Sequence, residues 1–143
     1  MRQIIAAGES YPLERNAPDN EIEDYFFRDG NRVYKAVSEN EIVGVYYLRP
    51  NQNGGGSHVA NAGFMVSAEA RGKGVGRALA LHSLEIAKEL GFEAMQFNFV
   101  ISANSVAVKL WKSLGFKIVG TLPRAFDHPS GGKVDAFVMH RFL

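Results

Sequence analysis

A short run rich in glycine, Arg71-Gly72-Lys73-Gly74-Val75-Gly76, constrains this chain more than any other part of its sequence. A strand-like apolar segment precedes the run, and the pattern of an amphipathic helix begins near Val75. Glycines allow an anion to approach the backbone closely, and the first N–H groups of a helix have no partner within it. Arg71, Lys73 and Arg77 add positive charge around these donors. The run therefore predicts a pyrophosphate site between a strand and a helix.

The composition is that of one globular domain covering residues 1–143, with 46% hydrophobic residues. The net charge of +1, from 16 basic and 15 acidic side chains, favours neither nucleic acid nor a membrane surface as a partner. Cysteine is absent, which excludes disulfides, zinc–thiolate sites and a cysteine nucleophile, and we expect no metal. Without a long apolar run or a signal peptide, the expected location is cytoplasmic.

Hydrophobic periodicity predicts an alternation of helices and strands. Helices are expected over residues 21–27, from near Val75 to Gly91, and over 104–114, with weakly helical pieces in the first 29 residues. Strands are expected over residues 33–38, 42–48, 59–66, 94–100, 116–122 and 134–142, with a flexible connection over 50–56 and a loop over 123–133. In the strand 94–100, Phe97 and Phe99 would share one face and Gln96 and Asn98 the other. This order predicts an α/β domain with a mixed sheet.

Three kinds of phosphate-binding loop can be compared with the glycine run. A Walker A loop needs a Ser or Thr after Lys73, and a dinucleotide fingerprint needs Gly-x-Gly-x-x-Gly, whereas Gly72, Gly74 and Gly76 are evenly spaced. The run does fit Arg/Gln-x-x-Gly-x-Gly/Ala on Arg71, Gly74 and Gly76. A glycine-rich turn that only begins a helix is the alternative that the run alone leaves open.

A second motif resolves this alternative. Asn104-Ser105-Val106-Ala107, then Leu110-Trp111 and Leu114-Gly115-Phe116, resembles Asn-x-x-Ala-x3-aromatic-x3-Gly-Phe, and both motifs together resemble the GNAT superfamily of acetyl-CoA-dependent N-acetyltransferases. The resemblance implies a mixed, mostly antiparallel sheet flanked by helices, with a V-shaped splay that receives acetyl-CoA. It also implies a set of CoA-binding residues. These are Val66, Arg71, Gly72, Lys73, Gly74, Val75, Gly76, Arg77, Asn104 and Trp111.

The chain departs from the common GNAT pattern at two catalytic positions. Many members place a Tyr seven residues after the motif Asn to protonate the CoA thiolate, and this chain has Trp111 there. An indole N–H donates a hydrogen bond but is no acid near neutral pH. The strand 59–66 also lacks the Glu or Asp that some members use as a base. Proximity and hydrogen bonding are therefore expected to contribute much of the catalysis.

Three asparagines are the polar residues of the expected site. Asn61 and Asn98 interrupt apolar strands, where asparagine is disfavoured and a buried amide needs partners. Asn104 is either the N-cap of the following helix or a ligand of the cosubstrate, and the two roles are compatible. His82 on the apolar stripe of its helix is expected to be packed, and Trp111 is first a core residue.

A closer resemblance links these residues to the fungal proline-analogue N-acetyltransferases, which acetylate azetidine-2-carboxylate and related amino acids. It is carried by residues 58–66, 95–98 and 104–111 and by a segment at residues 8–12. The resemblance implies that Asn61, with Phe64 beside it, recognises the substrate carboxylate. It further implies that Asn98 and Asn104 are catalytic, acting around the amine and the thioester.

The N-terminus and the acceptor leave alternatives open. GNAT proteins normally open with a β-strand, which the sequence does not predict here, so a partner chain in a homodimer is one source of that edge strand. The acceptor is expected to be a small-molecule amine, a proline analogue or another amino acid. A peptide or protein N-acetyltransferase and a CoA-binding module without turnover are the alternatives. The loop over residues 123–133, with Asp127 and His128, often borders the acceptor site in this superfamily.

Overall fold

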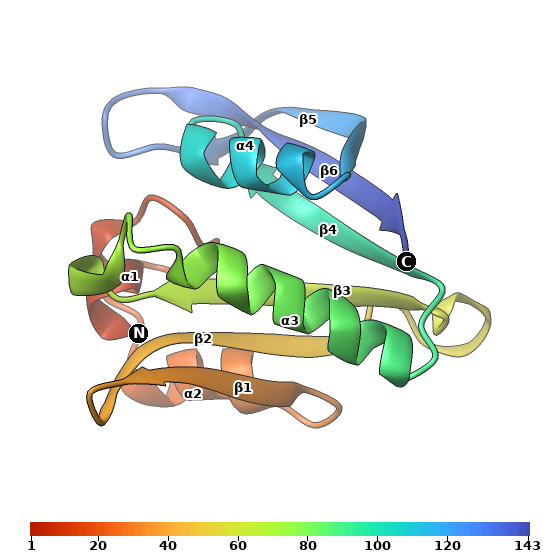
Figure 1. Cartoon of the computed structure of the whole chain (residues 1–143). Helices are drawn as coiled ribbons and strands as arrows, with labels where there is room; N and C mark the ends of the chain where they lie inside the picture. The colour runs from red at the N-terminus through yellow and green to blue at the C-terminus, as the bar shows by residue number, and fades with distance from the viewer.

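The protein is described here by a computed structural model of residues 1–143, which centres on one six-stranded sheet (Figure 1). The strand order is β1-β2-β3-β4-β6-β5, and every neighbouring pair is antiparallel except β3 with β4. The strands are β1 (Arg32–Ser38), β2 (Glu41–Pro50), β3 (Val59–Val66), β4 (Ala94–Ile101), β5 (Lys117–Asp127) and β6 (Lys133–Phe142). The helices are α1 (Arg2–Ala7), α2 (Asp19–Phe27), α3 (Val75–Glu89) and α4 (Ser105–Ser113), with single turns η1 (Gly54–Gly56) and η2 (Ala68–Ala70).

The helices cover opposite faces of the sheet. In Figure 1, α3 and α4 lie in front of the strands, whereas α1 and α2 lie behind them. The larger apolar core lies on the α3 and α4 side and includes Tyr46, Ala62, Leu84, Phe97 and Trp111. The smaller core, between α1, α2 and the sheet, is defined by Ile5, Tyr11, Ala17, Ile22, Phe26, Tyr47 and Met65, and we call it the N-terminal cluster. Each face of the sheet is thus anchored separately.

The central strands β3 and β4 pair over a very short length. Their parallel register covers only Val59 with Ala94 and Ala60 with Met95, after which the two strands part. On either side, β3 is paired with β2 over seven residue pairs and β4 stays paired with β6. Figure 1 shows the resulting V, with β1, β2, β3 and α3 in one arm and β4, β5, β6 and α4 in the other. The expected mixed sheet with a V-shaped splay is confirmed.

Two local expectations were wrong or incomplete. Strand β5 continues to Asp127 through Pro123, so the predicted loop from 123 is shorter. Proline is compatible with β5 because β5 is an edge strand, where one row of N–H groups needs no partner. In β4 the register shifts between Phe97 and Val100, so Val100 rather than Phe99 joins Phe97 in the larger core.

The first element of the described chain is α1, a helix of six residues, and no strand precedes it. It ends at Gly8, whose left-handed φ of 67° suits glycine, and α2 follows after residues 9–18. Separately, none of the helices is long and apolar enough to cross a membrane.

Gly63 is the residue of β3 over which the ring of Tyr47 lies. A Cβ added at Gly63 would stand 2.5 Å from Tyr47 Cε1 and 2.8 Å from Cζ, and the rigid ring could yield only by moving within the N-terminal cluster. Gly63→Ala is therefore expected to lower the free energy of unfolding by about 1–3 kcal/mol, measured by urea denaturation. The matched control is Gly55→Ala, where a Cβ meets nothing within 4 Å and a change below about 0.5 kcal/mol is expected. Equal stability of the two variants would contradict this packing.

Candidate active site

The glycine run forms the start of α3 at the open end of the V. Gly72 and Gly74 have left-handed φ values of 74° and 81°, and Gly74 is the N-cap residue of the helix. The backbone N–H groups of residues 72 and 74–77 have no hydrogen-bond partner within the protein, whereas Lys73 N–H bonds to Ala70 and Ala78 N–H bonds to Gly74. Five free donors are thus gathered within one turn of chain, which is the arrangement that an anion at a helix N-terminus requires.

The positive side chains around these donors are not neutralised. Arg71, Lys73 and Arg77 are exposed, and the single ion pair in the protein joins Arg2 to Asp19 at the other end of the chain. Arg77 Nη1 donates to Ser113 Oγ over 3.2 Å, a contact that links α3 to α4 across the gap. The residues that the sequence predicted for the pyrophosphate therefore lie together and retain their charge for a ligand.

Beyond the paired residues, β3 turns unpaired backbone groups toward the gap. Asn51 N–H donates to Val59 C=O and Ser67 N–H donates to Val43 C=O, so the odd-numbered residues of β3 bond toward β2. Backbone direction alternates along an antiparallel strand, so the groups of Phe64 and Val66 point to the side of β4, where no strand pairs with them. Val66, which the GNAT resemblance assigns to CoA binding, lies on this edge.

One carbonyl of this edge is already bonded. The Tyr11 hydroxyl, from the segment between α1 and α2, donates to the Phe64 C=O. Burial, followed by the neighbouring Tyr47 and Tyr25 hydroxyls, raises the pKa of Tyr11 well above its ordinary value. Tyr11 is therefore a neutral donor at physiological pH, and it attaches the N-terminal segment to the arm of the V.

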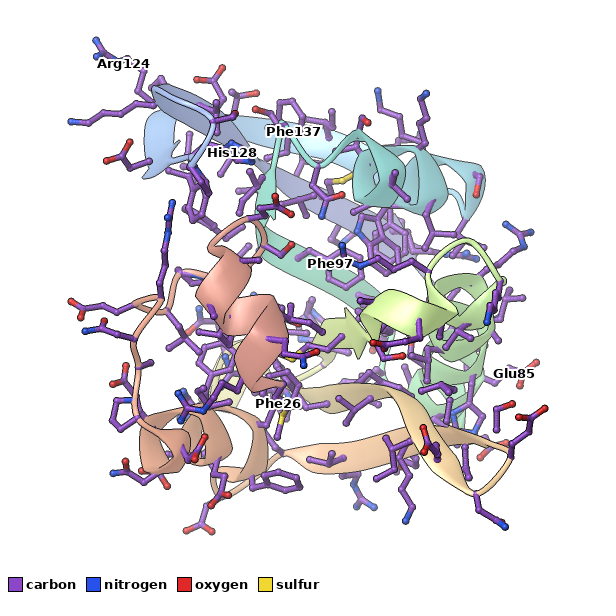
Figure 2. The ribbon with its side chains drawn as sticks, turned by 90° about the vertical axis from the view of Figure 1, so that its left-hand side faces the viewer. Phe26, Glu85, Phe97, Arg124, His128 and Phe137 are labelled. Atoms are coloured by element: carbon purple, nitrogen blue, oxygen red, sulfur yellow. The ribbon has the colours of Figure 1, made fainter.

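An aromatic wall lies between the arms on the α3 and α4 side. Trp111 packs against Phe97 and Phe64, with ring centroids 4.6 and 5.0 Å apart, and Phe64 in turn stacks on Tyr46. Figure 2, viewed from the open end of the V, shows Phe97 between the two halves of the protein. Trp111 is 8% exposed, which confirms that it is a core residue. Phe64 lies on the opposite face of β3 from Asn61, since alternate residues of a strand point to opposite faces.

Four side-chain amides form a chain of hydrogen bonds where β3 and β4 part, and we call them the amide cluster: Asn51, Asn61, Gln96 and Asn98. Asn51 Oδ1 accepts from Asn61 Nδ2 over 2.9 Å and from Asn98 Nδ2 over 2.7 Å. Gln96 Nε2 donates to Asn98 Oδ1 over 2.9 Å. Asn61 is 7% exposed, and it directly follows Ala60, the last residue of β3 that pairs with β4. The structure thus brings Asn61 and Asn98 together, through a residue that the sequence did not single out.

Asn104 occupies the start of α4, away from this hydrogen-bonded chain. Its Oδ1 accepts from Ala107 N–H over 3.1 Å, so it is the N-cap of the helix, as one of the two readings of the sequence predicted. Its Nδ2 makes no hydrogen bond within the protein, so this group is available to a ligand. The capping role and a ligand role remain compatible.

A cavity of about 290 Å³ opens on the α1 and α2 side of the sheet. It is lined by the segment between α1 and α2, including Tyr11 and Arg15, and by Phe126 and Asp127 of β5. Because Tyr11 both lines this cavity and bonds to Phe64, the cavity adjoins the gap. Phe126 contacts Phe99, the residue after Asn98, with ring centroids 6.3 Å apart.

The other titratable candidates form hydrogen bonds with residues near them in the fold. His82 is exposed on α3, where its Nδ1 lies 2.8 Å from the Tyr46 hydroxyl and its ring contacts Tyr34. Asp135 accepts from Arg124 N–H, and His128 bonds to Ser130 in the turn of the β5–β6 hairpin. In Figure 2, Arg124 extends away from the rest of the protein. No group of three or more His, Cys, Asp or Glu side chains gathers as a metal site.

Fold and site together define the class of the protein, and comparison with known proteins identifies its family. Residues 1–116 match the acetyltransferase (GNAT) family, so the chain belongs to this family and is an acyltransferase. The N-acetyltransferase aca1 of Schizosaccharomyces pombe is 32% identical, over 94% of this chain and 72% of the yeast protein. The L-amino acid N-acetyltransferase AaaT of Escherichia coli is 29% identical, over 99% of this chain and 89% of the bacterial protein. A GCN5-related N-acetyltransferase structure from Kribbella flavida has a TM-score of 0.93 at 45% identity, covering 99% of this chain and 87% of its own.

The raised pKa of Tyr11 predicts a loss of stability in alkali. Above pH about 10 the unfolded chain releases the tyrosine proton while the folded chain keeps it, so rising pH favours unfolding. Tyr11→Phe removes one such proton, so its thermal midpoint should fall less steeply than that of the wild type between pH 9.5 and 11.5. At pH 7 the variant should be less stable by about 1 kcal/mol because the bond to Phe64 is lost. Parallel declines of the two midpoints would contradict the burial of this hydroxyl.

Proposed function

We propose that the protein transfers the acetyl group of acetyl-CoA to the amine of a small amino acid or a similar carboxylate-bearing molecule. The observation that supports this most is the position of the amide cluster, which lies where the unpaired edge of β3 begins. A ligand extended along that edge from the glycine run would bring its far end to these amides.

The residues at the open end of the V fit the CoA moiety. The pyrophosphate would accept from the free N–H groups of residues 72 and 74–77, with Arg71, Lys73 and Arg77 around it. Space for it exists, because a Cβ added at Gly72 or Gly74 meets nothing within 4 Å. The pantetheine amides would pair with the backbone of Val66 in the gap, as strands pair elsewhere in the sheet.

The reaction then takes place between the two arms. The neutral amine attacks the thioester carbonyl and forms the C–N bond, and the C–S bond breaks to release CoA thiolate. The nitrogen then loses its excess proton and the thiolate takes up one proton, which gives the amide and the CoA thiol. Asn98 would orient the amine and the carbonyl through its amide, since it extends from β4 beside the gap. No carboxylate is hydrogen-bonded to the amide cluster, and the ammonium proton of the acceptor would pass to water or to a backbone carbonyl. Catalysis by this site is mainly positioning and hydrogen bonding.

Hydrogen-bond donors on or beside α4 would stabilise the leaving thiolate. Asn104 uses its oxygen for the helix cap, so its Nδ2 donors are available for the sulfur. Trp111 on the same helix presents an indole N–H, which stabilises a thiolate by hydrogen bonding without giving up its proton. These roles follow the resemblance to the proline-analogue N-acetyltransferases and the positions of both residues beside the gap.

The chemistry of the amide cluster favours an acceptor with a carboxylate. Its members are neutral amides, whose N–H groups donate to a carboxylate, and Asn61 is the member that the resemblance assigns to this contact. A polyamine or a basic peptide would instead need acidic side chains at the amide cluster, and none is hydrogen-bonded to it. The name of AaaT, an L-amino acid N-acetyltransferase, supports the same class of acceptor. Phe64 would contribute to substrate binding from the aromatic wall, which lies on the other face of β3 from Asn61.

The CoA assignment is tested at the helix N-terminus. Gly74→Asp places a carboxylate among the free N–H groups and is expected to abolish CoA binding, measured by isothermal titration calorimetry. The matched control is Gly91→Asp after the other end of α3, where φ is 83° and a Cβ also meets nothing within 4 Å. The control carries the same backbone strain and charge, so it should bind CoA like the wild type. Equal CoA affinity of the two variants would contradict the assignment of the glycine run to the pyrophosphate.

The acceptor class is tested by the release of CoA thiol in the presence of different amines. We expect turnover with azetidine-2-carboxylate, proline analogues or simple amino acids, and little with polyamines or N-terminal peptides. Asn98→Ala should lower turnover with the best acceptor by about tenfold or more while acetyl-CoA affinity stays near that of the wild type. Turnover with peptides alone would refute the small-molecule proposal, and an absence of turnover with every amine would favour a CoA-binding module.

A further inference from the structure

Asn51 is the residue on which the amide cluster converges. Its Oδ1 accepts two hydrogen bonds, one from Asn61 on β3 and one from Asn98 on β4. At Asn61 and Asn98 the backbones of β3 and β4 no longer pair with each other. A single oxygen atom therefore joins the two arms of the V just past the point where the sheet splits.

The backbone of Asn51 is fixed where the chain leaves β2. Pro50 is the last residue of that strand and pairs with Ala60, and Asn51 N–H donates to Val59 C=O over 2.7 Å. The chain then passes through η1 and returns to β3. The position of the Asn51 backbone is thus fixed by the pairing of Pro50 and by its own N–H bond, independently of its side-chain contacts.

These bonds determine how the neighbouring amides are turned. Since Asn51 Oδ1 can only accept, it fixes the Nδ2 ends of Asn61 and Asn98 toward itself. Asn98 Oδ1 is then turned toward Gln96 Nε2, which donates to it. The Oδ1 of Asn61 and one N–H of each Nδ2 are left for other partners. Without Asn51, Asn61 would lose its one side-chain hydrogen bond, and the amide of Asn98 would be oriented by Gln96 alone.

We propose that Asn51 is a positioning residue, which sets the amide orientation of Asn61 and Asn98 for the acceptor and the thioester. This inference rests on the proposed function, because it assigns to Asn51 the ordering of the residues that would meet the two substrates. A misplaced group at a reacting centre costs about tenfold to a hundredfold in rate, without a comparable loss in binding of the distant cosubstrate.

The test compares three variants by kinetics. Asn51→Leu keeps the size of the side chain but removes the acceptor, and we expect kcat to fall about tenfold or more while KM for acetyl-CoA changes less than about twofold. Asn51→Asp keeps an oxygen that accepts from both amides and should recover most of the lost kcat. The control is Asn53→Leu in the same connection, since Asn53 makes no side-chain cap bond at η1, and it should match the wild type.

A second measurement does not depend on turnover. In ¹H–¹⁵N spectra without substrates, the side-chain NH₂ signals of Asn61 and Asn98 should shift together in Asn51→Leu, return toward wild-type positions in Asn51→Asp, and stay unchanged in Asn53→Leu. Unchanged signals in Asn51→Leu would overturn the positioning role, and so would wild-type kcat in that variant. A wild type that acetylates no amine would refute the proposed function instead, whatever the spectra show.

Discussion

Backbone pairing between β3 and β4 lasts for two residue pairs, and the site depends on its ending there. A continuous sheet would bond the backbone groups of Phe64 and Val66 to β4 and leave no edge for a ligand. The split is maintained because each strand has a full partner on its other side, β2 for β3 and β6 for β4. What the sheet loses at its centre is replaced by side chains. The aromatic wall fills the α3 and α4 side, and the amide cluster lies on the other.

The two faces of the sheet divide the work of the enzyme. The larger core holds α3 against the strands and so fixes the glycine run, whose free N–H groups face the open end of the V. The N-terminal cluster holds Tyr11 on the opposite face, where it lines the cavity and bonds to the edge of β3. We therefore propose that one face positions the donor and the other receives the acceptor.

The sequence was most informative where the chemistry is local. The glycine run and the Asn104 cap lie within single turns of chain, and both were predicted from their own residues. Asn61 and Asn98 were found because an amide is disfavoured in an apolar strand, although their shared partner was not. Asn51 follows Pro50 in a polar stretch that looks like an ordinary connection, and its role depends on contacts with residues 10 and 47 positions away. The bulge in β4, which removed Phe99 from its expected face, likewise depends on pairing with β6.

We propose that the acetyl group lies beside the amide cluster at the point where β3 and β4 part. A crystal structure of the protein with CoA and an acceptor amino acid tests this placement. We expect the pyrophosphate at the N–H groups of residues 72 and 74–77, pantetheine along β3 at Val66, and the sulfur and the acceptor amine within reach of Asn98. A CoA sulfur outside the gap, or an acceptor bound away from Asn61 and Asn98, would contradict it.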